Sequence, residues 1–426
     1  MEKLLKYRAD DPSEAVYRLN FITSLILIAF GLLIEGSPLK SLQGLWTVWT
    51  SPAALVTDFV AVGGMGGAFL NCGGAMLISV LFIGLAKAEW NGLAFATCFI
   101  NAGYALYGKT VPNMLPIILG AYIYAKLLKQ PFKTTVITGL AITCLGPLVT
   151  FLALQGPGAL PFRLFLAVLF GIIVGFLGVM CAPVTMRLHN SYNLYNVGLA
   201  AGFIGMTLVS FLKNFGIEFA PVSSWTNDHD LPLLCLMLGI CLLYLLGGLW
   251  MNKGFKGYKG IIEHSGRGSD YVKIIGLPVA MINMGIVGIM VIAYTFLVGA
   301  HLAGPVCSGV LTLLGYAAFG KNPYTIIWLW LGVILLSFFS VWNLNDPGIL
   351  LATFFMTCLS PVTGELGPVW GMLAAMLHIS LVQNTAAAAG WMNLYNNGFA
   401  AGLALIVVLP LQEFIVKLKE AWTTKE

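Results

Sequence analysis

One ten-residue segment occurs almost unchanged at two places in this chain. NLYNVGLAAG covers residues 193–202 and NLYNNGFAAG covers residues 393–402, with eight identical positions at an offset of 200. Four further matches lie upstream in the same order, at offsets of 212 to 214: 57–60 with 269–272, 71–73 with 283–285, 103–109 with 315–321, and 143–147 with 357–361. Ordered matches at a nearly constant spacing indicate an internal duplication. The chain is therefore predicted to contain two copies of one structural unit.

The composition places these copies in a membrane. Apolar residues make up 59% of the chain and charged residues only 9%, whereas soluble domains carry about 25% charged residues. A bilayer core of about 30 Å needs roughly 20 apolar residues for each crossing helix, and long apolar runs recur along the whole sequence. The predicted fold class is an all-α integral membrane protein, with the lipid bilayer as its main partner and no nucleic-acid partner.

Fourteen apolar segments are candidate membrane-spanning helices, seven in each half. In the first half they cover 18–35, 66–86, 92–107, 112–127, 134–154, 163–184 and 192–212. In the second half they cover 231–250, 278–298, 303–319, 323–342, 347–362, 367–386 and 393–414. The third and the tenth segments are short, so each is either a complete crossing or a half-helix that re-enters on the same side.

The distribution of lysine and arginine favours fourteen complete crossings. With the N-terminus in the cytoplasm, fourteen crossings place 18 of the 22 basic residues on the cytoplasmic side. If the third and tenth segments do not cross, the two sides of the membrane carry 12 and 10 basic residues. Cytoplasmic loops are enriched in Lys and Arg, so the first arrangement is preferred. Because seven is an odd number, the second copy is predicted to be inverted relative to the first.

This topology divides the chain into five parts. They are a cytoplasmic N-terminal segment at 1–17, a first seven-helix repeat at 18–213, an external connector at 214–230, a second seven-helix repeat at 231–414, and a cytoplasmic tail at 415–426. Inverted repeats are typical of secondary transporters, in which the substrate binds near the membrane midplane between the repeats.

Two known groups of proteins share some of these features. Two inverted seven-helix copies, each with a short third helix, are similar to the nucleobase and bicarbonate/sulfate transporter architecture. Those transporters commonly use carboxylates on the eighth and tenth helices, whereas 231–250 and 303–319 contain no Asp or Glu. The paired NLYN-GxAAG signatures and FGKNP at 319–323 resemble an uncharacterised prokaryotic family, the domain-of-unknown-function family 1576. That resemblance covers essentially the whole chain and implies a multi-pass protein of a prokaryotic cytoplasmic (inner) membrane, without implying an activity.

The cysteines do not indicate a cofactor. They lie within apolar segments, without a CxxC or Cys/His cluster: Cys72, Cys98, Cys144, Cys181, Cys235, Cys241, Cys307 and Cys358. Cysteines in such surroundings act as small packing residues. We therefore predict no metal site and no cofactor, and we find no catalytic constellation such as Ser/His/Asp.

Asn71 and Asn283 are expected to lie deep in the membrane. Each follows an aspartate of its repeat by thirteen residues, which corresponds to a rise of about 18–20 Å along a helix. Polar side chains at that depth are costly and often mark functional sites. Substrate binding and helix packing explain these two asparagines equally well.

Other candidate substrate ligands lie near helix starts. The decapeptides contribute Asn193, Asn196, Asn393 and Asn396. Their spacing of three puts each pair on one helical face, and interhelical packing is favoured over direct ligand contact. If the third and tenth segments are half-helices, the amide-rich starts at Asn91, Gly92 and Gly304 favour an anionic or strongly polar solute.

Candidate ion-coupling residues carry oxygen atoms. Asp58 and Asp270 follow Thr or Ser at helix starts, which favours N-capping over coupling to Na⁺ or H⁺. The proline-interrupted segment of the second copy adds Thr357, Ser360 and Glu365. A broken helix there would offer oxygens to a cation, and an ordinary loop is the alternative. Lys109 and Lys321 follow glycines at helix ends, where a cation suits the helix dipole, and we interpret both as structural.

The favoured function is transport of a small polar or anionic solute by alternating access, at a midplane site between the repeats. A facilitative channel is the first alternative. A membrane-embedded sensor or enzyme is a weaker one, because neither a soluble domain nor a catalytic constellation is found. The 49 glycines allow close helix packing, either inside one subunit or between the subunits of a homodimer.

Overall fold

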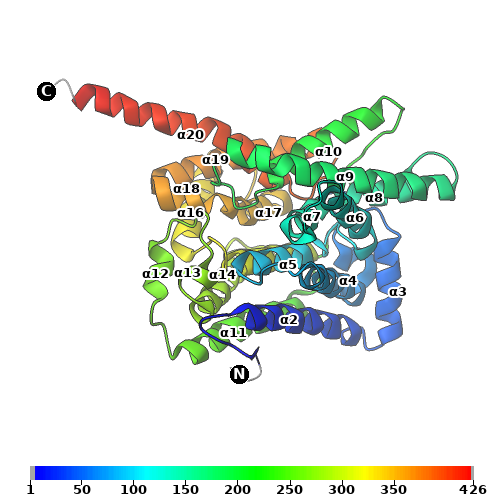
Figure 1. The fold of residues 1–426 in the computed structure, drawn as a ribbon, viewed down its shortest axis with the longest axis horizontal. Coiled ribbons are helices and arrows are strands. Elements are labelled where there is room, and N and C mark those ends of the chain that lie inside the picture. The colour runs from blue at the N-terminus through cyan, green and yellow to red at the C-terminus, as the bar shows by residue number, and fades with distance from the viewer. Residues whose placement is uncertain (1–4, 424–426) are drawn as a thin grey trace.

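The computed structural model describes residues 5–423, which form helices joined by turns and loops (Figure 1). The first half contains α2 (Ser13–Leu33), α3 (Pro38–Trp49), α4 (Phe59–Leu85), α5 (Gly92–Tyr104), α6 (Val111–Leu127), α7 (Val136–Ile142), α8 (Gly146–Gln155), α9 (Leu160–Leu188) and α10 (Gly198–Lys213). The second half contains α11 (Asp230–Asn252), α12 (Tyr258–Glu263), α13 (Tyr271–Ile274), α14 (Leu277–Leu297), α15 (Gly304–Tyr316), α16 (Pro323–Ser337), α17 (Pro347–Phe355), α18 (Ser360–Leu366), α19 (Pro368–Ala388) and α20 (Asn396–Thr423).

The described chain is a multi-pass membrane protein. Eight helices or continuous helix pairs are long and apolar enough to cross a bilayer: α2, α4, α7 with α8, α9, α11, α14, α17 with α18, and α20. The apolar helices α6, α10, α15 and α16 are shorter. Together with α5 and α19, these elements overlap all fourteen predicted segments. The number of complete crossings stays a prediction.

The two short segments, α5 and α15, form the centre of the molecule. Each has 13 residues, all or nearly all buried, and is about 20 Å long. A Cβ atom on Gly103 of α5 would meet Ser308 of α15, and one on Gly315 would meet Phe99. The two helices are therefore antiparallel and touch along their length.

Several helices are interrupted at matching positions of the two halves. Gly64 breaks α4 with a φ of +70°, and Gly276 separates α13 from α14 with a φ of +111°; the two glycines are 212 residues apart. One turn of 3₁₀ helix, Thr143–Leu145, joins α7 to α8, and another, Met356–Leu359, joins α17 to α18. Each turn comes just before a proline, which lacks the N–H that an uninterrupted α-helix requires.

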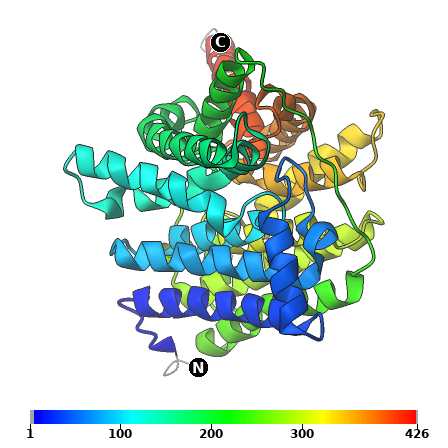
Figure 2. The ribbon, with the colours of Figure 1, turned by 90° about the vertical axis from the view of Figure 1, so that its right-hand side faces the viewer.

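Two short helices were not anticipated from the sequence. In Figure 1, α3 lies across the right-hand ends of the long helices, and α12 lies on the left. Both are too short and too polar to resemble a membrane span. Seen from the α3 side, the connector between α10 and α11 runs along the outside of the molecule (Figure 2).

The first and last helices extend beyond the predicted spans. Helix α2 begins at Ser13, inside the predicted N-terminal segment 1–17, and α20 continues through most of the predicted tail 415–426. Residues 1–4 and 424–426 of those two segments lie outside the described part of the chain.

Candidate functional site

Two lysines are buried at the centre of the molecule. Lys109 and Lys321 follow α5 and α15, and both are 0% exposed. Gly108 and Gly320, with φ of +104° and +92°, turn the chain inward just before them. The backbone N–H of each lysine then donates to the last residue of its helix, Tyr104 or Tyr316. The turn directs both ammonium groups into the protein rather than to a helix end facing water.

Neither lysine has a carboxylate partner within residues 5–423. The Lys109 ammonium donates to Asn101 and lies 5.8 Å from the ring centre of Tyr104 and 5.9 Å from that of Tyr395. The ion pairs found within residues 5–423 involve neither lysine. Lys109 is thus held by an amide oxygen and by the electron-rich faces of tyrosines.

Lys321 has a corresponding environment. It donates to the Tyr195 hydroxyl at 3.0 Å and to Thr357 Oγ1 at 2.8 Å. Its ammonium lies 4.7 Å from the ring centre of Tyr195 and 5.1 Å from that of Tyr316. Each lysine therefore contacts one tyrosine of its own half and one decapeptide tyrosine of the other half.

The rings around the lysines form a continuous buried group, which we call the aromatic plug: Tyr104, Tyr107, Tyr195, Tyr316, Phe355 and Tyr395. Ring centres of Tyr104 and Tyr395 are 5.0 Å apart, and those of Tyr195 and Tyr316 are 4.9 Å apart. The two pairs join through Tyr195 and Tyr395 at 6.0 Å. The plug thus links the two lysines through residues of both halves.

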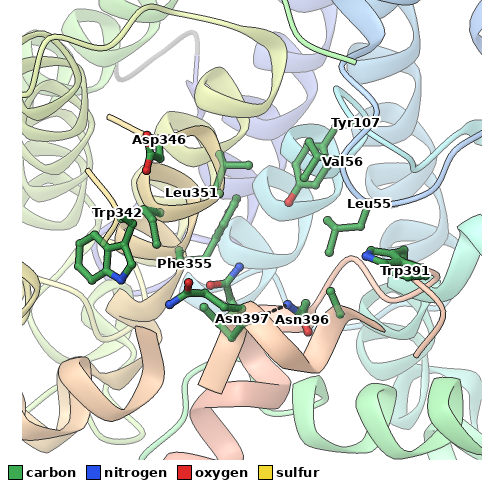
Figure 3. A pocket seen from close by; sticks show the side chains of 16 residues that line it. Leu55, Val56, Tyr107, Trp342, Asp346, Leu351, Phe355, Trp391, Asn396 and Asn397 are labelled. Atoms are coloured by element: carbon green, nitrogen blue, oxygen red, sulfur yellow. Dashed lines mark hydrogen bonds between the residues drawn. The ribbon is translucent and has the colours of Figure 1, made fainter. Parts of the chain in front are cut away.

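Two cavities end at this plug. The larger, which we call the Asn396 cavity, has a volume of about 370 Å³ and lies between the loop before α4, helix α17, the end of α19 and the start of α20 (Figure 3). Tyr107 and Phe355 of the plug line it. The smaller, the Asn196 cavity, has about 170 Å³, lies between α5, α7, the end of α9 and the start of α10, and is lined by Tyr316.

The two cavities are built from matching positions of the two halves. At an offset of 200 their lining residues pair as Val382 with Ala182, Gln383 with Pro183, Ala386 with Met186, Asn396 with Asn196, and Asn397 with Val197. At an offset of 214 they pair as Leu351 with Ile137, Ala352 with Thr138, and Phe355 with Ala141. The same part of each unit therefore forms a cavity.

Asn71 and Asn283 hold the turns that lead into Lys109 and Lys321, and the oxygen and nitrogen atoms of both side chains form hydrogen bonds. The Asn71 amide donates to the carbonyls of Ala105 and Lys109 at 2.8 and 2.7 Å and accepts from Trp49 of α3 at 3.0 Å. Asn283 makes the corresponding bonds to residues 317 and 321 at 2.7 and 2.8 Å and accepts from Tyr258 of α12 at 3.1 Å. Neither side chain lines the Asn396 cavity or the Asn196 cavity.

The decapeptide asparagines have separate roles. Asn193 donates to the carbonyl of Gly398 at 2.8 Å, whereas the amide nitrogen of Asn393 has no partner among the described residues. Asn196 and Asn396 line the two cavities named after them. Asn396 also bonds to the end of α19, donating to Val382 and accepting from Thr385.

Asp58 and Asp270 cap helices and also join the two halves. Asp270 accepts from its own Val272 and Lys273 and from Gly92 at the start of α5. Asp58 accepts from Val60 and Thr226, and its carboxylate lies against Gly304 at the start of α15. Asn91 caps α5 itself. The helix starts at Gly92 and Gly304 are thus occupied by carboxylates of the protein.

These two carboxyl groups lie just outside the predicted spans. Burial raises the pKa of Asp58 to about 6 and also raises the pKa of Asp270, although the donated amides favour the charged forms. Coupling of either group to H⁺ or Na⁺ stays a prediction.

Removal of one such cap has a defined expected cost. Asp270→Ala leaves the amides of Gly92, Val272 and Lys273 without their acceptor, so we expect a loss of about 2 kcal/mol in folding free energy. Asp270→Asn keeps one acceptor oxygen and should lose less. Thermal unfolding in detergent tests this order, and equal losses in the two variants would contradict the capping role.

The remaining ion-coupling candidates do not converge on one point. Thr357 accepts from Lys321, and Ser360 donates to the Thr357 carbonyl inside the helix. Glu365 instead forms an ion pair with Arg267 at 2.7 Å and accepts from Tyr192 at 2.9 Å. The segment around Ser360 is helix α18 and not a loop. No group of three or more His, Cys, Asp or Glu that could hold a metal occurs in residues 5–423.

The sequence interpretation missed the lysines and tyrosines as site residues. A usable signal was present, because Lys109, Tyr104 and Tyr195 all recur as the same residue type in the second copy. A buried cation retained in both copies is harder to explain by packing than a retained glycine.

Comparison with known proteins gives one family. Residues 37–214 and 250–414 match the family described as "Protein of unknown function (DUF1576)". No curated protein and no solved structure matches the chain.

Proposed function

We propose that this chain, which belongs to the DUF1576 family, carries a small polar or anionic solute across a membrane by alternating access. The observation that carries the proposal is the pair of cavities built from matching positions, which end at opposite parts of one aromatic plug. A carrier of this type exposes its site to one side at a time, and a removable barrier between two access routes is what it requires.

The proposal includes inversion of the second half relative to the first. Hydrogen bonds that link matching positions of the two halves support it. The backbone N–H of Leu194 in the first half donates to the carbonyl oxygen of Cys358 in the second. The backbone N–H of Leu394 in the second half donates in the same way to the carbonyl oxygen of Cys144 in the first. The central helices α5 and α15 are antiparallel, each beginning at a carboxylate of the other half. With inversion, the Asn396 cavity faces the outside and the Asn196 cavity faces the cytoplasm. Both chain ends are then cytoplasmic, as expected for a prokaryotic inner-membrane protein.

A channel is the competing function. It needs a continuous water-filled route, and the described residues place closely packed rings between the two cavities. This barrier favours a carrier over a channel.

Cysteine labelling tests the proposal. In a background that lacks the accessible Cys181 and Cys235, the matched substitutions Ala386→Cys and Met186→Cys report on the two cavities. A membrane-impermeant thiol reagent should label the first only from outside and the second only from the cytoplasm.

The double variant separates a carrier from a channel. A bulky maleimide attached at position 386 should hold the outer cavity open and slow labelling at position 186 by at least about tenfold, because only one side opens at a time. Labelling of both positions from one side would disprove inversion. An unchanged rate at position 186 would favour the channel.

A further inference from the structure

We infer that Lys109 and Lys321 bind the charged group of a small organic monoanion, whose apolar body occupies the adjoining cavity. This inference names the substrate class of the proposed transport and rests on that proposal. It follows from the charge of the buried lysines, from an unpartnered tyrosine hydroxyl and from the residues that line the Asn396 cavity.

The charge balance of the centre is incomplete. Two ammonium groups are fully buried, and the nearest protein oxygens to which they donate belong to an amide, a phenol and a threonine hydroxyl, all neutral. A buried cation is costly unless an anion accompanies it. Asp58 and Asp270 do not supply this anion, since their oxygens accept hydrogen bonds from backbone amides, Asp58 from Val60 and Thr226 and Asp270 from Gly92. A bound anion would supply the missing charge.

An unpartnered donor lies beside Lys109. The hydroxyl of Tyr395 is fully buried and has no hydrogen-bond partner within residues 5–423. The hydroxyls of Tyr104 and Ser308 are also buried, and both lie beside the Tyr107 hydroxyl. The rings of Tyr104 and Tyr395 are the two beside the Lys109 ammonium. Buried hydroxyls normally find a partner, so the Tyr395 hydroxyl is free to donate to an oxygen of an anion. The Asn393 amide nitrogen, two residues before Tyr395, is likewise unpartnered.

The residues that line the Asn396 cavity indicate the chemistry of the uncharged part of the ligand. Leu55, Val56, Leu351 and Phe355 face the space seen in Figure 3, with Asn396, Asn397 and the carboxylate of Asp346 also lining it. Apolar walls bind an apolar body, whereas a small inorganic anion would lose its hydration without compensation. Each lysine offers a single positive charge, which matches a ligand with one anionic group. A carboxylate or sulfonate on an aromatic or aliphatic body meets all three requirements.

Benzenesulfonate is the probe, because it stays charged at every working pH, and neutral benzenesulfonamide is its control. Calorimetry on the purified full chain should show saturable binding of benzenesulfonate and no binding of benzenesulfonamide. Lys109→Met and Lys321→Met should each raise the Kd about 10- to 100-fold, as loss of a charge-assisted hydrogen bond implies. Lys126→Met is the matched control, because Lys126 also lies over a tyrosine ring, at 5.3 Å, but on the surface.

If the two lysines have a purely structural role, their substitution should change the melting temperature and leave the Kd for benzenesulfonate unchanged. Removing an unpaired buried charge should leave the ligand-free melting temperature unchanged or higher, whereas loss of a structural contact would lower it and leave the Kd unchanged. Lys109→Gln and Lys321→Gln provide the same comparison if a methionine variant fails to fold. Absence of benzenesulfonate binding to the native protein, or equal Kd values in the variants, would overturn the inference.

Counterflow of labelled benzenesulfonate in proteoliposomes separates this inference from the proposed function. Binding without counterflow would keep the anion site and count against transport. Alternating cysteine labelling without benzenesulfonate binding would keep the carrier and remove the anion site.

Discussion

Valine at position 198 or 398 is expected to prevent the two halves from assembling. Gly198 and Gly398 occupy the same place in the two decapeptides, and they meet where α10 crosses α20. A Cβ atom on Gly198 would lie 2.6 Å from the Cα atom of Gly398, and one on Gly398 would lie 3.0 Å from the Cα atom of Gly198. Both neighbours are backbone atoms, which cannot rotate away.

The expected cost is at the upper end of the range for overpacking, about 3 kcal/mol or more, because relief requires separation of two helices. Asn193 donates to the Gly398 carbonyl across the same contact, and separation would also break this bond. We expect little monodisperse protein in detergent extracts of either variant. Gly239→Val on α11 is the control, since no atom lies within 4 Å of its added Cβ. A yield of Gly198→Val equal to that of the control would show that the crossing is not tight.

Much of the fold could be predicted because hydropathy determines where a membrane helix lies. Each of the fourteen predicted segments overlaps a helix, even the 13-residue α5 and α15. Helices α3 and α12 were missed because they are short and polar, and their role is visible only in three dimensions. Trp49 and Tyr258 reach from them to Asn71 and Asn283.

The site was harder to predict because its parts come from both halves. The position of Lys109 after a glycine suggested a cation at a helix end, but the turn at Gly108 directs it inward, towards Tyr395 of the other half. No spacing within one copy reveals that contact. The depth of Asn71 was inferred from its distance along the helix from Asp58, whereas its carbonyl partners depend on how α5 ends.

Leucine in place of Asn71 or Asn283 is expected to destabilise the protein strongly and to displace the neighbouring lysine. Each substitution leaves two buried backbone carbonyls and one side-chain donor without a partner. Unsatisfied buried groups cost about 1–3 kcal/mol each, and partial rearrangement reduces the sum, so we expect a loss of about 2–4 kcal/mol. The effect should appear as a lower melting temperature in detergent.

The control is another buried asparagine in a membrane helix. Asn20 of α2 donates only to the Val16 carbonyl one turn earlier, and its Oδ1 atom has no partner among residues 5–423. Asn20→Leu removes an unpartnered group and leaves Val16 with its helical bond, so its melting temperature should be unchanged or higher. If all three leucine variants melted alike, burial of any asparagine would explain the effect, and the specific support of the Lys109 and Lys321 turns would be disproved.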